Sequence, residues 1–182
     1  MAQVAYPSKP VRMIVPFAPG GGTDTLGRLV AQQLGELWNT SVVVENRPGA
    51  GSTVGTDLAV RAPADGYTLG VTSMSHAINA TLYRKLPYDS IKQFTHVALL
   101  GVAPVLIMAN PKTGPATLKD LPKAAAAPGY SFGSGGPGSI GHIVGEMSKS
   151  AMKLQMTHIP YKGGAPMTTD LIAGTVPLGI DV

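Results

Sequence analysis

Two glycine-rich turns, each between a short apolar run and a helical pattern, constrain this chain more than any other feature of its sequence. The first turn follows the apolar residues 11–16 and reads PGGGTD at residues 19–24. The second follows the strand-like residues 130–134 and reads SGGPGSIGH at residues 134–142. Strands that lead through glycines into helices are typical of α/β folds with parallel strands. The sequence therefore predicts an α/β protein in which this unit occurs twice.

The first half of the chain is expected to alternate strands and helices. Strands are predicted at residues 11–16, 41–45 and 67–73, with helices after the first glycine turn, after the glycine-rich segment that follows residue 46, and at residues 75–83. The first two strands and their helix should form a parallel unit. The helix after the first turn is expected to bury one face, made of Leu26, Leu29, Val30, Gln33, Leu34 and Leu37.

Two apolar runs, THVALLGV at residues 95–102 and PVLIMAN at residues 104–110, are both read as strands and meet near Ala103. The domain crossing is placed there, which gives a first α/β domain at residues 1–103 and a second at residues 104–182. Helices are expected at residues 117–127, 138–151 and 166–174, and strands at residues 156–161 and 175–182. Because the chain stops within that last strand, the second domain is expected to be incomplete. The helix at residues 138–151 should bury Ile140, Ile143, Val144 and Met147.

Composition excludes several classes of protein. Hydrophobic residues make up 44% and charged residues 13% of the 182 residues, which indicates a globular chain. No apolar stretch approaches the roughly 20 residues that cross a bilayer. There is no cysteine, so disulfides, thiolate metal sites and cysteine nucleophiles are excluded. Lysines and arginines are scattered and aromatic residues are only 5%, which argues against nucleic acid despite the net charge of +4 and favours an anionic small ligand.

The first glycine turn is suited to an anion. Glycines allow backbone amides to approach a ligand closely, and the helix N-terminus adds a partial positive charge, so a carboxylate or a phosphate is the expected guest. A nucleotide P-loop would need a lysine directly after the last glycine, where this chain has Thr23 and Asp24. The alternative is a tight turn in which Thr23 or Asp24 caps the helix.

The second turn leaves two functions open. GPGSIG at residues 136–141 matches the glycine pattern of dinucleotide-binding proteins, but no acidic residue lies between Ser150 and Asp170 to hold a ribose. Lys162 could instead serve a phosphorylated ribose, so an NADP-dependent enzyme remains an alternative. His142 lies away from the predicted buried face, where it is either solvated or available to an anion.

Catalytic and metal chemistry have little support in the sequence. Ser139 misses the nucleophile-elbow pattern by one position, and no pair of carboxylates stands out for acid–base work. The four histidines show no spacing typical of metal ligands. We therefore expect no catalysis, no cofactor and no metal. The start, MAQVAYPSKP, lacks the pattern of a signal peptide and is read as a mature N-terminus from which such a peptide has been removed.

Five blocks of the sequence together resemble one protein family. They are YPSKPVRMIVPFAPGGGTD, VVVENRPGAGSTVGTDLAVRAPADGYTL, LYRKLPYD, SFGSGGPGSIGH and HIPYKGGAPMTTDLIAG, at positions 6–24, 42–69, 82–89, 131–142 and 158–174. In this order they closely resemble the extracytoplasmic solute receptors of tripartite tricarboxylate transporters, the TctC or Bug family. The resemblance implies a two-domain, periplasmic-binding-protein-like architecture of type II-like form, of which the C-terminal part is missing here.

The resemblance also implies a function and a set of site residues. A periplasmic receptor of this kind performs no catalysis and delivers a di- or tricarboxylate, an aromatic acid or an acidic amino acid to membrane transporter subunits. Backbone amides and hydroxyls of both turns would hold the carboxylate, directly and through ordered water. The positions that match the family's first ligand loop are Phe17, Ala18, Gly20, Gly21, Gly22, Thr23 and Asp24. Those that match its second are Gly133, Ser134, Gly138, Ser139 and His142.

Three further positions match less specifically. Ser73 and Ser75 look like additional ligand-contacting residues, with a helix cap as the alternative, and Asp181 falls where a variable ligand-contacting segment begins, with a strand-end turn as the alternative. Family members are longer than this chain. A shortened chain would present open strand edges, which favour dimerisation or strand exchange, or would bind nothing at all.

Overall fold

The computed structural model describes residues 6–182. Its contacts divide the chain into two compact units, Met1–Leu100 and Gly101–Val182, and each is described by itself. This division lies close to the boundary expected after Ala103. Among the described residues, no helix is both long and apolar enough to cross a membrane.

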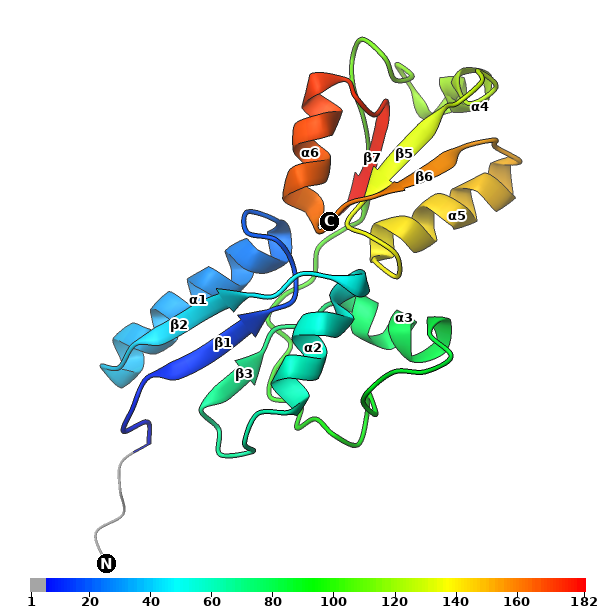
Figure 1. Ribbon diagram of the computed structural model, residues 1–182. Helices are drawn as coiled ribbons and strands as arrows, with labels where there is room; N and C mark the ends of the chain where they lie inside the picture. The colour runs from blue at the N-terminus through cyan, green and yellow to red at the C-terminus, as the bar shows by residue number, and fades with distance from the viewer. Residues whose placement is uncertain (1–5) are drawn as a thin grey trace, which may run out of the picture. The chain divides into compact units, whose positions relative to one another are not determined.

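The first unit contains a parallel sheet covered by helices (Figure 1). Its strands are β1 (Val11–Val15), β2 (Val42–Asn46) and β3 (Thr68–Gly70), in the order β2-β1-β3. Both pairings are parallel, with Val11 opposite Val42 and Arg12 opposite Thr68, so the predicted parallel unit is confirmed. Helix α1 (Gly22–Trp38) contacts β1 and β2, and α2 (Thr53–Val60) contacts β1 and β3. A short 3-10 turn, η1 (Ala50–Ser52), precedes α2, and α3 (Met74–Leu82) follows β3.

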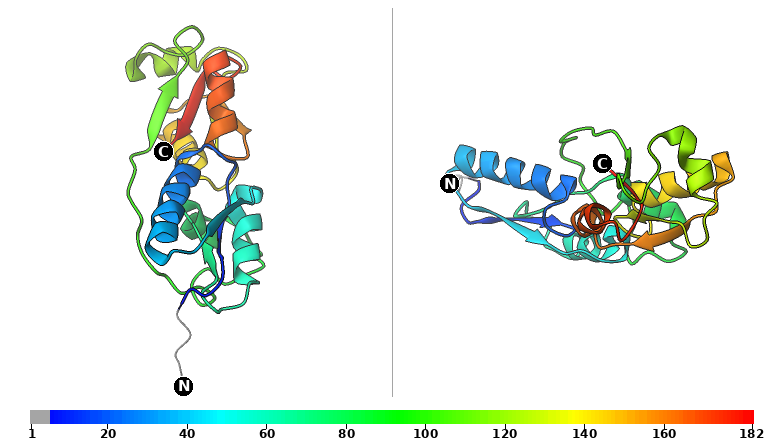
Figure 2. Two further views of the ribbon diagram at one scale, coloured as in Figure 1. Left: turned by 90° about the vertical axis from the view of Figure 1, so that its left-hand side faces the viewer. Right: turned by 90° about the horizontal axis from the view of Figure 1, so that it is seen from above.

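The second unit contains a mixed sheet. Its strands are β4 (Leu106–Ala109), β5 (Ser131–Ser134), β6 (Thr157–Pro160) and β7 (Leu178–Asp181), in the order β4-β7-β5-β6. β5 runs parallel to both β6 and β7, and β4 runs antiparallel to β7. The helices are α4 (Leu121–Ala124), which follows the 3-10 turn η2 (Leu118–Asp120), then α5 (Ile140–Met152) and α6 (Gly164–Ala173). Two views of Figure 2 show α6 beside β7, with which it is in contact.

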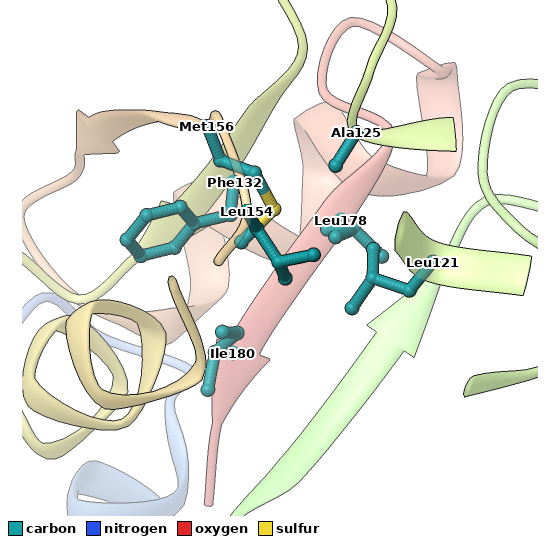
Figure 3. Close-up of a cluster of buried hydrophobic side chains, with 7 residues drawn as sticks. All are labelled: Leu121, Ala125, Phe132, Leu154, Met156, Leu178 and Ile180. Carbon is teal, nitrogen blue, oxygen red and sulfur yellow. The ribbon is translucent and has the colours of Figure 1, made fainter. Parts of the chain in front are cut away.

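The main core of the second unit joins its sheet to α4 and to the segment between α5 and β6. Its side chains are drawn in Figure 3 and are all buried: Leu121, Ala125, Phe132, Leu154, Met156, Leu178 and Ile180. They come from α4 and the residue after it, from β5 and β7, and from the segment between α5 and β6. A smaller cluster, Met167, Leu171 and Val176, packs between α6 and the sheet.

Two predicted elements are wrong or shorter than expected. Residues 95–102 form no strand, and the side chains of Val97, Leu99 and Val102 are 82%, 83% and 89% exposed. A strand needs a hydrogen-bonded neighbour, and no segment within residues 6–182 pairs with this one. The helix expected at residues 117–127 is limited to η2 and α4. Apolar runs alone did not determine these elements, because sheet pairing depends on other parts of the chain.

The faces on which the helices pack agree with prediction only in part, since Val30, Leu34 and Val144 pack against the cores but other predicted residues are exposed. In α1, Gln33 is exposed and the side chains of Leu29 and Leu37 are 57% and 77% exposed, whereas Asp24, Gly27 and Ala31 are buried. In α5, Met147 is 64% exposed, and the buried residues are Gly141 and Gly145. A Cβ on Gly27 would lie 3.1 Å from Val15 Cγ2, and one on Gly145 would overlap the ring of Phe132. Small residues therefore face the sheets, which allows close packing of helix and strand.

Candidate functional site

The first glycine turn leaves the carboxyl end of β1 and enters α1. Gly20 has a φ of +87°, and Gly21 is the N-cap residue of α1. In the described part of the chain no side chain caps this helix, so the predicted cap by Thr23 or Asp24 is wrong. The first amides of an α-helix have no partner within the helix. The amide donors at the start of α1 are therefore left for an external acceptor.

Asp24 lies inside this turn, and its side chain points into the protein. It is 2% exposed and accepts hydrogen bonds from the Gly20 amide at 2.8 Å, Arg28 Nε at 3.0 Å and Asn46 Nδ2 at 2.7 Å. Burial by itself would raise the pKa of Asp24, but the hydrogen bonds from Arg28, Asn46 and Gly20 outweigh it and the pKa is lowered. The carboxylate is thus held ionised and fixes the shape of the turn.

Asn46 is a residue of this site that the sequence analysis missed. It is the last residue of β2, and its Nδ2 donates both to Asp24 Oδ1 and, at 3.0 Å, to the carbonyl of Phe17. It therefore ties the end of β2 to both sides of the first turn. Its position at the end of the strand-like run VVVEN was visible in the sequence, but its partners were not.

Another loop, with an unusual backbone conformation, leaves the same end of this sheet. After β2, Gly49, Ala50, Gly51 and Ser52 all have positive φ angles, which are uncommon for alanine and serine. The fully buried Asn79 of α3 donates to the Gly51 carbonyl at 2.7 Å, which supports this conformation. Because β1, β2 and β3 are parallel, the loops after all three strands leave one edge of the sheet.

Ser73 and Ser75 follow β3 at that edge. Ser73 is the N-cap residue of α3, and its hydroxyl accepts a hydrogen bond from the Ser75 amide at 3.3 Å. Ser75 is 1% exposed, and its hydroxyl lies 3.2 Å from that of Ser73. Ser73 therefore caps α3, as the alternative for these serines had it. The cap lies at the same edge of the sheet as the first turn.

The second glycine turn leaves the carboxyl end of β5. Gly136 and Gly138 have φ angles of +116° and +77°, and the Gly138 amide donates to His142 Nδ1 at 3.2 Å. Ser139 is the N-cap residue of α5, and its Oγ accepts from the His142 amide at 3.2 Å. Gly133 lies under the turn, where a Cβ would come within 3.0 Å of the ring of Tyr161. The second glycine turn is thus tightly packed against the residues around it.

A cluster of hydroxyls and imidazoles lies beneath this turn. Ser134 is completely buried, and its Oγ lies 2.7 Å from His158 Nε2 and 3.2 Å from Ser139 Oγ. The ring of His142 stacks on that of His158, with centroids 4.2 Å apart, and so is partly buried. Burial and the neighbouring His142 lower the pKa of His158 to about 4. His158 is therefore neutral near pH 7, and the sequence analysis had considered it only as a metal ligand.

Asp181, the last residue of β7, completes this edge of the second sheet. A Cβ on Gly164, the first residue of α6, would overlap Asp181 Oδ2, so the carboxyl lies against the start of that helix. Burial raises the pKa of Asp181. Since β5 and β7 are parallel neighbours and Asp181 is the last residue of β7, Asp181 and the second turn lie at one edge.

Elsewhere in the described chain there is less support for a functional site. Within residues 6–182, no three His, Asp or Glu residues are grouped as a metal site would require. A pocket of about 350 Å³ lies beside the C-terminal end of α6, where Asn110, Thr113 and Gly174 help to line it. It contains none of the predicted site residues, and the chemistry suited to an anion lies at the sheet edges.

The chain is similar to known proteins over most of its length. A family model described as the tripartite tricarboxylate transporter family receptor matches residues 26–181. Protein BugT of Bordetella pertussis is 37% identical over 180 residues, which cover 97% of this chain and 55% of that protein. A UPF0065 protein of Agrobacterium vitis is 37% identical over 182 residues, which cover 99% and 53%. The chain thus spans about half the length of the curated relatives it matches.

Solved structures are also similar to this chain. A protein of R. palustris in a structure with adipate is 35% identical, with a TM-score of 0.92 over 97% of this chain and 60% of that one. MatC from Rhodopseudomonas palustris, with bound malate, is 31% identical, with a TM-score of 0.90 over 97% and 61%. The predicted α/β fold of the periplasmic-binding-protein type is therefore confirmed.

Proposed function

Because the chain belongs to the tripartite tricarboxylate transporter receptor family, we propose that it binds a small carboxylate as part of a periplasmic, noncatalytic solute receptor. The observation that carries the proposal is its likeness to two structures that hold dicarboxylates, adipate and malate. The ligand would be a di- or tricarboxylate, an aromatic acid or an acidic amino acid. The receptor would pass it to the membrane subunits of such a transporter.

The geometry of the two turns supports this function. The uncapped start of α1, after Gly20 and Gly21, offers backbone amides and the positive end of a helix dipole. We propose that Phe17, Ala18 and the residues from Gly20 to Thr23 contact the ligand, while Asp24 holds the turn in shape. In the second unit, Gly133, Ser134, Gly138, Ser139 and His142 would contribute hydroxyl, imidazole and amide groups.

The remaining predicted positions would influence which carboxylate is preferred. Asp181 carries a partly buried carboxyl at the same sheet edge as the second turn. An ionised Asp181 would attract the ammonium group of an acidic amino acid and repel a second ligand carboxylate. Ser73 and Ser75, which follow β3, would contribute further contacts to the ligand.

Thermal unfolding with a panel of ligands tests the proposal. The panel contains mono-, di- and tricarboxylates, aromatic acids, acidic amino acids and NADP. A carboxylate at 100 times its dissociation constant should stabilise the folded protein by about 2.7 kcal/mol. Stabilisation by one class of carboxylate would identify the ligand, and Asp181→Asn should then alter the preference between dicarboxylates and acidic amino acids.

The other outcomes contradict the proposal in different ways. Stabilisation by NADP alone would favour the dinucleotide-binding alternative at residues 136–141. No stabilisation by any compound would mean that this chain does not bind carboxylates. Ser148→Ala serves as a control, because Ser148 donates only to the Val144 carbonyl of its own helix and should leave any ligand response unchanged.

A further inference from the structure

We propose that a buried water molecule binds between Tyr88 and Asp57 and holds the segment that follows α3 against α2. Tyr88 belongs to that segment, which forms no helix or strand around it, and is 6% exposed. Asp57 lies on α2, where it pairs with Arg61. None of the predicted ligand-contacting residues belongs to this site, so it stands independently of the proposed function.

Both side chains end in a buried polar atom that has no hydrogen-bond partner within residues 6–182. These atoms are the Tyr88 hydroxyl oxygen and Asp57 Oδ1. Packing fixes the tyrosine, whose ring lies parallel to that of His76 and edge-on to that of Phe94, with centroids 6.1 Å and 5.9 Å away. The carboxylate is fixed because Asp57 Oδ2 accepts from Arg61 Nε at 2.8 Å. Buried polar atoms without a protein partner are commonly satisfied by ordered water.

The two side chains also lie close to each other. Burial raises the pKa of Tyr88, the neighbouring Thr56 hydroxyl lowers it, and the negative charge of Asp57 also raises it. Thr56 and Asp57 are therefore near enough to act on the phenol, although its hydroxyl makes no direct hydrogen bond with either. A polar contact longer than a hydrogen bond is commonly bridged by water.

One water molecule finds three partners at this place, which is the usual number for a buried water. It donates to Asp57 Oδ1, since a carboxylate oxygen can only accept, and it accepts from the Tyr88 hydroxyl. Its second hydrogen goes to Thr56 Oγ1. That hydroxyl donates its own hydrogen to the Ser52 carbonyl at 2.9 Å and keeps the capacity to accept. Thr56 is 6% exposed, so the third partner is buried as well.

The water complements a direct contact that holds the same segment to α3. His76 Nε2 lies 2.8 Å from the Ser90 carbonyl, which can only accept, so the imidazole donates. Residues 88–90 are thus attached to α3 by His76 and to α2 by the water. Both helices begin beside loops that leave the sheet edge at which the first glycine turn lies. The site therefore helps to fix the helices behind that edge.

A crystal structure of the full chain at a resolution that shows ordered water tests the proposal directly. We expect density for one water molecule within hydrogen-bonding distance of both the Tyr88 hydroxyl and Asp57 Oδ1. A direct hydrogen bond from Tyr88 to Asp57 or Thr56, with no water between them, would overturn the proposal.

Urea unfolding followed by circular dichroism tests the contribution of the water. Tyr88→Phe removes one of its partners, so the equilibrium constant for unfolding should rise by roughly threefold to tenfold, the equivalent of one net hydrogen bond. Tyr130→Phe is the matched control, because the Tyr130 hydroxyl is also buried without a partner in the described chain and burial alone raises its pKa. Its removal should leave stability unchanged or increase it. A Tyr88→Phe protein at least as stable as the wild type would contradict the water bridge.

A double-mutant cycle shows whether Tyr88 and Asp57 share the water. Asp57→Ala removes the acceptor, and in that background Tyr88→Phe should lose most of its effect on the unfolding constant. Asp57→Asn keeps an amide that can still bind the water, so Tyr88→Phe should keep most of its effect there. Equal effects of Tyr88→Phe in the wild-type, Asp57→Asn and Asp57→Ala backgrounds would show that the two residues are not connected.

Discussion

At the scale of single residues, the first glycine turn is organised by one buried charge. Asp24 accepts hydrogen bonds from a turn amide, from Arg28 on the next turn of its helix and from Asn46 at the end of a neighbouring strand. A buried carboxylate is stable only when it is paired and hydrogen-bonded, and this one is both. The negative charge therefore stabilises a turn whose free amides are suited to an anion.

Asp24→Asn should destabilise the protein by about 1–3 kcal/mol at pH 7, because three donors lose an ionised acceptor. The folded-state pKa of Asp24 is below its usual value of 3.8, so its contribution is complete above that value and is lost as the pH falls through the folded pKa. Urea titrations from pH 7 down to pH 3 should show the two proteins becoming more alike in stability at the acid end.

Asp57→Asn provides a matched control for this prediction. Asp57 also pairs with an arginine four residues later on a helix, Arg61, but its side chain is 25% exposed and the pair lies at the surface. Its loss should cost no more than about 1 kcal/mol at pH 7. Equal effects of the two substitutions would show that Asp24 has no special role in the turn.

At the scale of elements, small residues let α1 and α5 approach their sheets closely, beside larger apolar residues that pack against the cores. Hydrophobic periodicity correctly located α1 and α5, and part of each predicted face packs against a core, as Val30, Leu34 and Val144 do. Leu29, Leu37 and Met147 were expected to be buried and are exposed. The prediction missed four small residues that are buried, Gly27, Ala31, Gly141 and Gly145. Because these small residues let α1 and α5 pack closely on their sheets, the first turn of each helix lies next to a glycine turn.

Gly145→Ala should destabilise the second unit by roughly 1–3 kcal/mol, because the added methyl overlaps the ring of Phe132 in a filled core. Gly35→Ala in α1 is the control, since its nearest neighbour, the Thr40 carbonyl, would be at an ordinary 3.4 Å. That change should be neutral or stabilising by up to about 1 kcal/mol. Urea unfolding measures both, and a Gly145→Ala protein as stable as Gly35→Ala would contradict the packing described.

At the scale of the whole molecule, the chain exposes apolar side chains along one extended segment. Residues 95–102 have no regular structure, and Val97, Leu99 and Val102 are each more than four-fifths exposed. Extended apolar segments and unpaired strand edges are common sites of association between chains. We therefore propose that this chain associates with itself, by dimerisation or strand exchange.

Sedimentation velocity over a range of concentrations tests this proposal. The wild-type chain should form dimers or larger species as its concentration rises, and the double variant Val97→Asp, Leu99→Asp should remain monomeric. Leu37→Asp removes a similarly exposed apolar side chain on α1 and should leave the association unchanged. A wild-type chain that is monomeric at all concentrations would refute the proposal.

The family, the α/β class and the positions of both glycine turns could be predicted from the amino-acid sequence alone. These depend on local patterns: glycines between an apolar run and a helical repeat, and blocks of residues in a fixed order. The sequence also placed most strands and helices to within a few residues.

The hydrogen-bond partners of the polar side chains at the site depend on how the chain folds and could not be predicted. Asp24 of α1 is joined to Asn46 at the end of β2, and Ser134 of β5 to His158 of the neighbouring β6, although the partners lie more than 20 residues apart in the sequence. No local pattern encodes such a pairing, because it depends on strand order and register. The missing strand at residues 95–102 has the same cause, since an apolar run becomes a strand only when a partner is present to accept and donate its backbone hydrogen bonds.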